Sequence, residues 1–225
     1  MIESLQRDDT RSKILDAAEQ MFAEHGFDGT SIREITRVAD VNVAAVHYHF
    51  GSKEALLQAV LARRLAPINR RRIELLDRLE QDAGPGAPSM TQVIGAFLEP
   101  PLSEIRRLGP SGEQFVRLAG RAHSEPNPQV RAVFLPLFQD VVTRFVAAFR
   151  RARPEMGDGE LHWKFHFLVG AMSHLLSWGG HQECAVMLNS DAPAVADPDE
   201  MLRAMVAFCT AGMSAPTPEG GRAGR

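Results

Sequence analysis

Hydrogen-bonding side chains gather between residues 30 and 53, beside a run of small apolar ones. His47, Tyr48 and Lys53 carry donors that can reach phosphate oxygens or the polar edges of bases. The small side chains of residues 43–45 allow a helix to approach base edges closely, and their methyl groups can contact the methyl group of thymine. Together these residue types predict a surface that contacts DNA.

Local sequence rules place these side chains on two short helices joined by a turn. Ser31 can cap the first helix, and Glu34 three residues later completes a capping box. A hydroxyl group at that helix start suits a phosphate oxygen, because free backbone N–H groups there favour an anion. Asp40 ends the first helix, and Asn42 is a good cap for a second helix over about residues 43–49.

The second helix is too short to be stable alone, so Val46 and Phe50 must pack onto the rest of the domain. Gly51 then stops it, and Ser52 caps the next helix. This layout predicts a DNA-reading helix-turn-helix, whose second helix lies in the major groove. The candidate DNA-binding residues are Thr30, Ser31, Arg33, Asn42, Val43, Ala44, Ala45, His47, Tyr48, His49 and Lys53.

Residues 10–60 resemble the N-terminal domain of the TetR family of transcriptional regulators. The motifs that carry the resemblance are Ile14–Ala18, Phe22–Phe27, Thr30–Ile35, Asn42–Phe50 and Ser52–Leu56. One departure is Asp40, where the family usually has glycine. That position needs a left-handed backbone, which Asp tolerates less well than Gly, so we expect the turn to be slightly strained or differently shaped.

The remaining sequence predicts helices, and the expected fold is all-α. We expect a three-helix helix-turn-helix domain over residues 1–52, a helical ligand-binding and dimerisation domain over 53–213, and a flexible tail over 214–225. Pro67 is expected to kink or break one helix, and Pro136 to bend another.

Composition is that of an ordinary globular protein, with 44% hydrophobic and 24% charged residues among 225. No apolar run approaches the length of a membrane span, and residues 1–9 do not resemble a signal peptide. Two scattered cysteines favour a reducing cytoplasm over a disulfide framework. The net charge of −3 and the acidic N-terminal part predict weak non-specific DNA binding.

Residues 160–178 predict a helix that is apolar around most of its circumference and must be buried on two faces. Together with a last helix over about residues 199–213, it could form a four-helix interface between two copies of the chain. The candidate interface residues are Trp163, Phe167, Gly170, Ala171, His174, Trp178 and Met205.

Residues 161–171 and 113–153 are similar to the C-terminal domain of PsrA-type TetR regulators, which respond to long-chain fatty acids. This resemblance implies a small apolar effector, such as a fatty acid or an acyl-CoA. The candidate effector-binding residues are Phe97, Phe115, Leu118, Arg121, Phe138, Phe165, His166, Val169 and Met172. For each of the apolar ones, we favour plain core over pocket wall.

Signs of catalysis or metal binding are weak. His162, His166 and His174 share a helix at metal-compatible spacing, but no HExxH motif or cysteine pair accompanies them. We therefore expect no enzyme, cofactor or metal site. The favoured interpretation is a homodimeric repressor that binds a palindromic operator in double-stranded DNA and is not attached to a membrane. The alternative is a helical module that captures a ligand or protein and binds DNA weakly.

Overall fold

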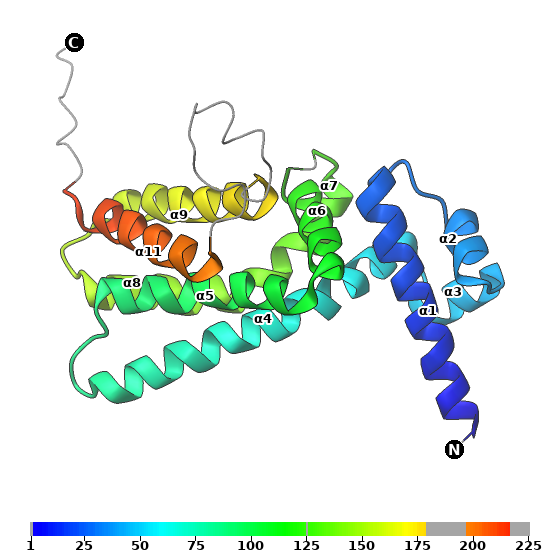
Figure 1. Cartoon of the computed structure of the whole chain (residues 1–225), viewed down its shortest axis with the longest axis horizontal. Helices are drawn as coiled ribbons and strands as arrows, with labels where there is room; N and C mark the ends of the chain where they lie inside the picture. Colours follow the sequence, from blue (N-terminus) through cyan, green and yellow to red (C-terminus); the bar gives the residue numbers. More distant parts are fainter. Residues whose placement is uncertain (1, 125, 179–196, 217–225) are drawn as a thin grey trace, which may run out of the picture. The chain divides into compact units, whose positions relative to one another are not determined.

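The computed structural model describes residues 2–124, 126–178 and 197–216, and every regular element in those ranges is a helix (Figure 1). They are α1 (Ile2–His25), α2 (Ile32–Ala39), α3 (Val43–Phe50), α4 (Lys53–Ala83), α5 (Met90–Leu108), α6 (Pro110–Ser124), α7 (Pro128–Phe134), the 3-10 turn η1 (Leu135–Phe138), α8 (Gln139–Ala152), α9 (Asp158–Trp178) and α11 (Pro198–Ser214). The all-helical prediction is confirmed. Most of the predicted tail, residues 217–225, lies outside the described residues.

Packing divides the chain into two compact units, each built from two stretches of sequence. Unit 1 comprises Met1–Arg71 and Ser103–Val142, and unit 2 comprises Arg72–Leu102 and Thr143–Arg225. This grouping differs from the expected boundary after residue 52, because α6 packs against α1 and α7 packs against α6. The helices expected to bind DNA therefore share a core with helices from much later in the sequence.

The core of unit 1 forms around the apolar stripe of α1. Ile14, Ala18 and Phe22 are fully buried there, as their helical spacing predicts. Gly26 follows the helix with a φ of 74°, a left-handed value that glycine adopts without strain. The chain then returns Phe27 to the core, where its ring centre lies 6.0 Å from that of Phe22.

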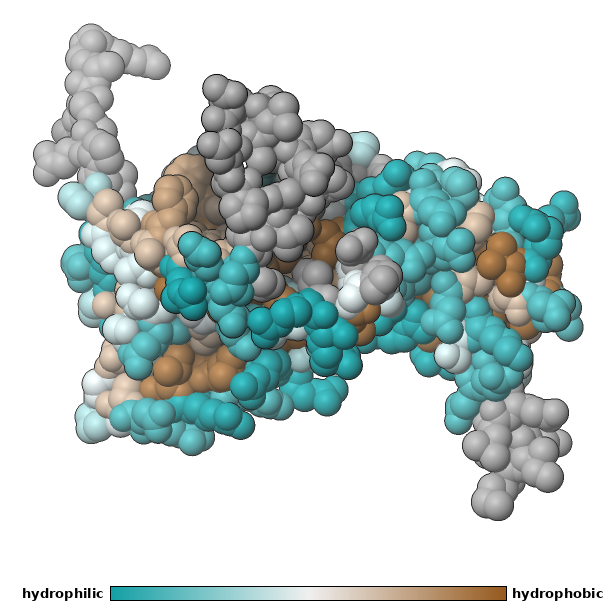
Figure 2. Space-filling model, in the orientation of Figure 1, coloured by the Kyte–Doolittle hydropathy of each residue, from teal (hydrophilic) through white to brown (hydrophobic). Residues whose placement is uncertain are grey.

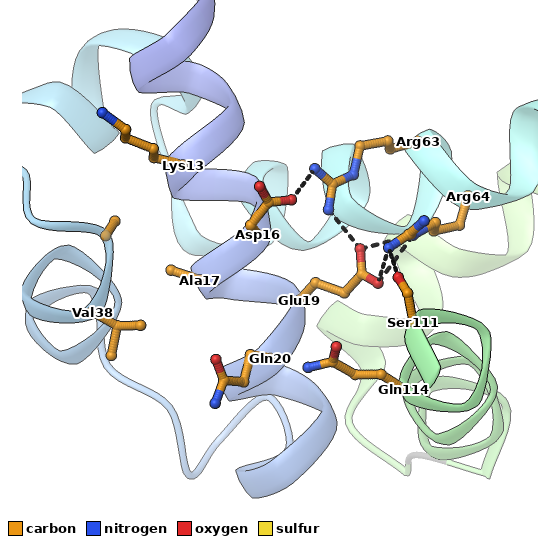
Figure 3. Close-up of a pocket in the computed structure, with 11 residues that line it drawn as sticks. Lys13, Asp16, Ala17, Glu19, Gln20, Val38, Arg63, Arg64, Ser111 and Gln114 are labelled. Atoms are coloured by element: carbon orange, nitrogen blue, oxygen red, sulfur yellow. Dashed lines mark hydrogen bonds and ion pairs between the residues drawn. The ribbon is translucent and has the colours of Figure 1, made fainter. Parts of the chain in front are cut away.

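A buried carboxylate fastens α1 to α4 (Figure 3). Glu19 is 2% exposed and accepts hydrogen bonds from Arg63 Nη2 at 2.6 Å and from Arg64 Nη2 at 2.8 Å. Arg64 also donates to the hydroxyl group of Ser111 in α6, at 2.6 Å. Burial alone would lower the pKa of Arg63, but hydrogen bonds to Glu19 and Asp16 outweigh it and raise that pKa. One carboxylate thus joins three helices.

An open cavity of about 500 Å³ lies beside this cluster. Its walls come from α1, α2, α4 and α6, with Arg63 and Arg64 on one side and Val38 on the other (Figure 3). The arginines at its edge are ion-paired to Asp16 and Glu19, so these charges are balanced within the protein.

The prolines do not all act as the sequence predicts. Pro67 lies inside α4 and does not end it, so of the expected kink or break, the break is wrong. Pro67 is exposed, and it removes one helical hydrogen bond, the one that the Arg63 carbonyl would accept. Buried Leu65 and Ile68 hold the helix on either side. Pro136 does interrupt its helix, because η1 separates α7 from α8.

Aromatic rings fill the core of unit 2. The ring of Phe97 lies 5.2 Å from Phe145 and 5.6 Å from Phe165, in edge-to-face contacts. Arg72 is buried among these residues, with its Nε donating to the Phe97 carbonyl at 2.8 Å and its Nη2 donating to Met172 Sδ at 3.2 Å. Burial lowers the pKa of Arg72 to about 9, so the side chain still carries its charge at neutral pH.

One stretch, Pro128–Ala152, is long and apolar enough to cross a membrane by length and composition. This differs from the expectation that no run would approach that length. The stretch consists of α7, η1 and α8, and its residues Phe134 and Phe145 are buried in cores of this protein. Core helices pass the same composition test, so the stretch is weak support for a membrane span.

The buried ion-pair cluster predicts a large loss of stability when its carboxylate is removed. We expect Glu19→Ala to lower the free energy of unfolding by about 3–5 kcal/mol, because it leaves Arg63 and Arg64 without their buried acceptor. Urea denaturation followed by circular dichroism measures this change. The exposed Glu24 on the same helix gives the matched control Glu24→Ala, expected within about 0.5 kcal/mol of the parent. Equal effects of the two substitutions would contradict the stabilising role of Glu19.

Candidate DNA-binding site

The start of α2 carries the capping box that the sequence predicts. The backbone N–H of Glu34 donates to Ser31 Oγ at 3.2 Å, and the backbone N–H of Ser31 donates to Glu34 Oε2 at 2.9 Å. Hydrogen bonds from the hydroxyl group and then the backbone of Ser31 lower the pKa of Glu34. The carboxylate therefore stays charged, and the cap is complete at neutral pH.

The turn between α2 and α3 requires a left-handed residue, and Asp40 supplies it. Asp40 has φ 54° and ψ 49°, and it is the one described non-glycine residue with a positive φ. Its backbone N–H donates to the carbonyl of Thr36, as does that of Val41 at 3.0 Å. The left-handed backbone expected at this position is present, and such a backbone costs an L-residue free energy that glycine avoids.

Helix α3 has one face buried and the opposite face exposed. The Asn42 side chain caps it by accepting from the backbone N–H of Ala45 at 2.8 Å. Val46 is fully buried and Phe50 packs against the same core. On the other face, Tyr48 is 65% exposed and Val43 is 39% exposed. The helix therefore presents side chains outward while its buried side fixes its orientation.

The junction of α3 with α4 is held by local contacts. Gly51 ends α3 with a φ of 79°, and its carbonyl lies 3.0 Å from His47 Nδ1. Ser52 caps α4 by accepting from the backbone N–H of Ala55 at 3.1 Å. Lys53 Nζ lies 4.2 Å from the centre of the Phe27 ring, a cation–π distance. These contacts place two polar side chains, His47 and Lys53, next to the exposed face of α3.

Two stretches of the chain match described protein families. Residues 14–60 match the bacterial regulatory proteins of the tetR family, and residues 95–212, about half of the chain, match the tetracyclin repressor-like C-terminal domain. This chain belongs to the TetR family. Its members are transcriptional regulators that bind operator DNA, and they are not enzymes.

Curated relatives of this TetR-family chain match it mainly in the N-terminal part. The probable transcriptional regulator YttP from Bacillus subtilis is 43% identical over 53 residues, or 24% of this chain and 26% of that protein. The transcriptional repressor NicS from Pseudomonas putida is 38% identical over 74 residues, or 33% of this chain and 35% of that protein. This chain thus spans only a quarter to a third of the length of these relatives.

Solved structures of TetR regulators resemble nearly the whole chain. The fatty acid degradation regulator FadR from Bacillus halodurans matches with a TM-score of 0.63 and 12% identity, over 96% of this chain and 97% of that one. The TetR-family regulator PfmR from Thermus thermophilus matches with a TM-score of 0.59 and 16% identity, over 93% and 98%. This likeness shows the fold, which confirms the predicted helix-turn-helix followed by a helical domain.

The structure brings most of the candidate DNA-binding residues to one surface. The exposed ones are Ser31, Arg33, Asn42, Val43, Ala44, His47 and Tyr48, and the half-buried ones are Ala45, His49 and Lys53. Thr30 is the exception and must be corrected: it is 2% exposed, and its hydroxyl donates to the carbonyls of Met21 and Gly26 at 3.1 and 2.7 Å. Its side chain holds the α1–α2 connection together instead of facing DNA.

Sequence reasoning missed two arginines at this surface. Arg7 Nη2 donates a hydrogen bond to Tyr48 Oη, and the Arg7 guanidinium carbon lies 5.3 Å from the Tyr48 ring centre. The guanidinium carbon of Arg11, one turn later, lies 5.5 Å from the ring centre of Phe50. The available signal was the spacing of two arginines on the exposed start of α1, but nothing local tied them to α3.

The candidate effector-binding residues fall in both units. Phe115 and Leu118 are buried in the core of unit 1, with Phe138 packed against it. The unit 2 members are Phe97, Phe165, His166, Val169 and Met172, of which His166 is exposed. Arg121, in unit 1, is exposed.

The candidate dimer residues lie on α9 and α11, which pack against each other (Figure 1). Trp163 and Phe167 are 60% and 67% exposed, and Gly170 and His174 are also exposed. Ala171 is half-buried, Met205 is buried, and the side chain of Trp178 lies outside the described part of the structure. Phe208, 73% exposed on α11, was not among the candidates.

Two of the histidines of α9, His162 and His166, form a ring cluster with Trp163. The rings of His162 and His166 lie 4.7 Å apart, and that of Trp163 lies beside both. Within the described ranges, no group of three or more His, Cys, Asp or Glu residues is arranged to hold a metal ion.

The backbone at Asp40 predicts opposite effects for two substitutions. We expect Asp40→Gly to raise the free energy of unfolding by up to about 1 kcal/mol, because glycine relieves the left-handed strain. We expect Asp40→Val to lower it by about 1–2 kcal/mol, because a branched side chain fits this backbone poorly. Urea denaturation of both variants measures the difference. The reverse order of stability would show that the Asp40 side chain contributes more than its backbone conformation.

Proposed function

We propose that this TetR-family chain is a repressor that binds a palindromic operator as a homodimer and leaves it when a small apolar ligand binds. The observation that carries the DNA-binding part is the two-sided packing of α3, with Val46 buried and Tyr48 exposed. A helix fixed in this way can enter a major groove. Two copies of the chain would meet half-sites about one helical turn apart, or slightly more.

Within each half-site, the exposed residues suit different parts of DNA. Val43 and Ala44 begin α3 and are small, so they suit close contact with base edges. His47 and Tyr48 suit bases or phosphates, while Ser31 and Lys53 at the starts of α2 and α4 suit phosphates. Base contacts would set the operator sequence, and phosphate contacts would set the position of the domain.

Exposed aromatic side chains on α9 and α11 support the dimer. Trp163 and Phe167 stack at 6.4 Å on successive turns of α9, and Phe208 projects from α11. Figure 2 shows apolar residues at the surface in the region of these helices. Apolar surface of this kind favours contact with another protein surface, and TetR regulators act as dimers.

A long-chain fatty acid or acyl-CoA is the effector class that we propose, in keeping with the PsrA-type resemblance. FadR from Bacillus halodurans, whose fold this chain shares, is a fatty acid degradation regulator. An acyl chain would have to enter the core of unit 2, where Phe97, Phe165 and Met172 supply apolar side chains. The buried guanidinium of Arg72 stacks on Phe97 and supplies a positive charge suited to an acid group.

Release from DNA requires that the ligand bind the released state more tightly than the DNA-bound state. A shift of α4, which begins directly after the recognition helix, would change the distance between the two copies of α3. Because its target is bacterial operator DNA, the proposed place of action is the cytoplasm.

Binding to DNA from upstream of the chain's own gene tests this proposal. Fluorescence anisotropy with that duplex, a scrambled duplex and added oleate or oleoyl-CoA is expected to show selective binding that either lipid abolishes. Selective binding that neither lipid changes would support the repressor function but reject a fatty acid or acyl-CoA as the effector. No selective binding would favour the alternative, a helical module that captures a ligand or protein and binds this DNA weakly.

A charge placed on the exposed face of α3 should abolish selective binding. We expect Ala44→Glu to weaken binding to the upstream duplex at least tenfold, because it sets a carboxylate against the polyanion. Gln58→Glu, at an exposed position on α4, adds the same charge away from the recognition helix and serves as the control. Anisotropy titrations compare the two, with circular dichroism to verify folding. Equal affinities would exclude α3 as the DNA-reading element.

A further inference from the structure

The first turns of α1 lie beside the recognition helix. Arg7 is hydrogen-bonded to the Tyr48 hydroxyl and lies over the Tyr48 ring, and Arg11 lies over the ring of Phe50. Both arginines are exposed and are one helical turn apart, so they share a face of α1. Their guanidinium groups therefore lie against the C-terminal half of α3, where the exposed Tyr48 projects.

The charges of Arg7 and Arg11 are available to an anion. Some cations of unit 1 are paired with carboxylates, such as Lys13 with Asp9 at 2.7 Å and Arg63 with Glu19 at 2.6 Å. Among the side chains that the structure describes, neither Arg7 nor Arg11 forms an ion pair. Residues 1–53 carry nine acidic and six basic residues, so these two arginines concentrate positive charge at the edge of α3 in an otherwise acidic stretch.

We propose that Arg7 and Arg11, together with the Tyr48 hydroxyl, form a binding site for a backbone phosphate of operator DNA. The proposal rests on the repressor function and adds to it two contacts that lie outside the helix-turn-helix. A guanidinium group matches the oxygens of a phosphate through two parallel hydrogen bonds. The aromatic rings under both groups orient them before DNA arrives, which reduces the ordering cost of binding.

The position of Tyr48 connects this site to the groove. If α3 lies in the major groove, its outward side chains face bases, and those at its edges face the phosphates along the groove wall. The Tyr48 hydroxyl can accept from Arg7 while it donates its own proton to a phosphate oxygen. A phosphate at this point would thus contact α1 and α3 together. Such a contact fixes the position of the domain but carries no base information.

The salt dependence of DNA binding tests this phosphate site. The probe is the tightest-binding duplex selected from a random-sequence pool, with a scrambled duplex beside it. Each phosphate contact contributes about 0.9 to the slope of log K against log salt, and a dimer holds two copies of the site. We therefore expect Arg7→Ala combined with Arg11→Ala to reduce the magnitude of the slope by about 1.8 and to weaken both duplexes by a similar factor. Arg7→Lys combined with Arg11→Lys keeps both charges, so we expect it to keep most of the slope.

Arg131 provides a matched control at the other end of α1. It is an exposed arginine of α7, whose cap Asn127 is hydrogen-bonded to Asp28, just after α1 ends. Arg7 lies about 27 Å along the helix axis from that end. Arg131→Ala is expected to leave the slope and the affinity unchanged. Arg7, Arg11 and Arg131 are exposed, so we expect their substitution to leave the fold intact. Circular dichroism of each variant verifies this.

Phosphate ethylation gives an independent readout. With the parent protein, ethylation of a phosphate beside each half-site is expected to block binding, and with Arg7→Ala and Arg11→Ala combined that interference is expected to disappear. An unchanged slope and an unchanged ethylation pattern in the double variant would overturn the phosphate site while leaving the repressor intact. If the parent protein selects no duplex, the repressor function fails and this site fails with it.

Discussion

Burial of one face of α1 is the interaction on which unit 1 depends. This helix packs against α2, α3 and α6, and its residues Ile14, Ala18 and Phe22 are fully buried at their common centre. The two helices of the helix-turn-helix have eight residues each, a length that is not stable alone in water. Their structure therefore comes from contact with α1 and α4. The ion pairs of Glu19 fix the position of α1 against α4, because a guanidinium–carboxylate pair tolerates little displacement.

The parts of the site that could be predicted from the sequence depend on neighbours within a few residues. Ser31 with Glu34 and Asn42 with the backbone of Ala45 each form a cap across three positions, and both caps are present. The left-handed turn at Asp40 likewise depends on residues close to it in the sequence. Local hydrogen bonds and backbone sterics decide these features, so the amino-acid order alone determines them.

The features that could not be predicted depend on distant parts of the chain. Thr30 has the right residue type for a phosphate contact, but the return of the chain to the α1 core buries its hydroxyl. Pro67 has the right type for a helix break, but buried neighbours on both sides keep α4 continuous. Arg7 meets Tyr48 across 41 positions, a separation at which local patterns carry no signal. In each case tertiary packing outweighed the local preference.

The short length of α3 has a thermodynamic consequence. Since the helix exists only while Val46 is buried, the surface proposed to meet DNA and the folded core of unit 1 are one cooperative structure. A duplex that binds this surface would then raise the melting temperature of unit 1 by mass action, by an amount that grows with the logarithm of the duplex concentration above its Kd. Conversely, any substitution that loosens the core around α1 will weaken DNA binding without touching a residue that meets DNA.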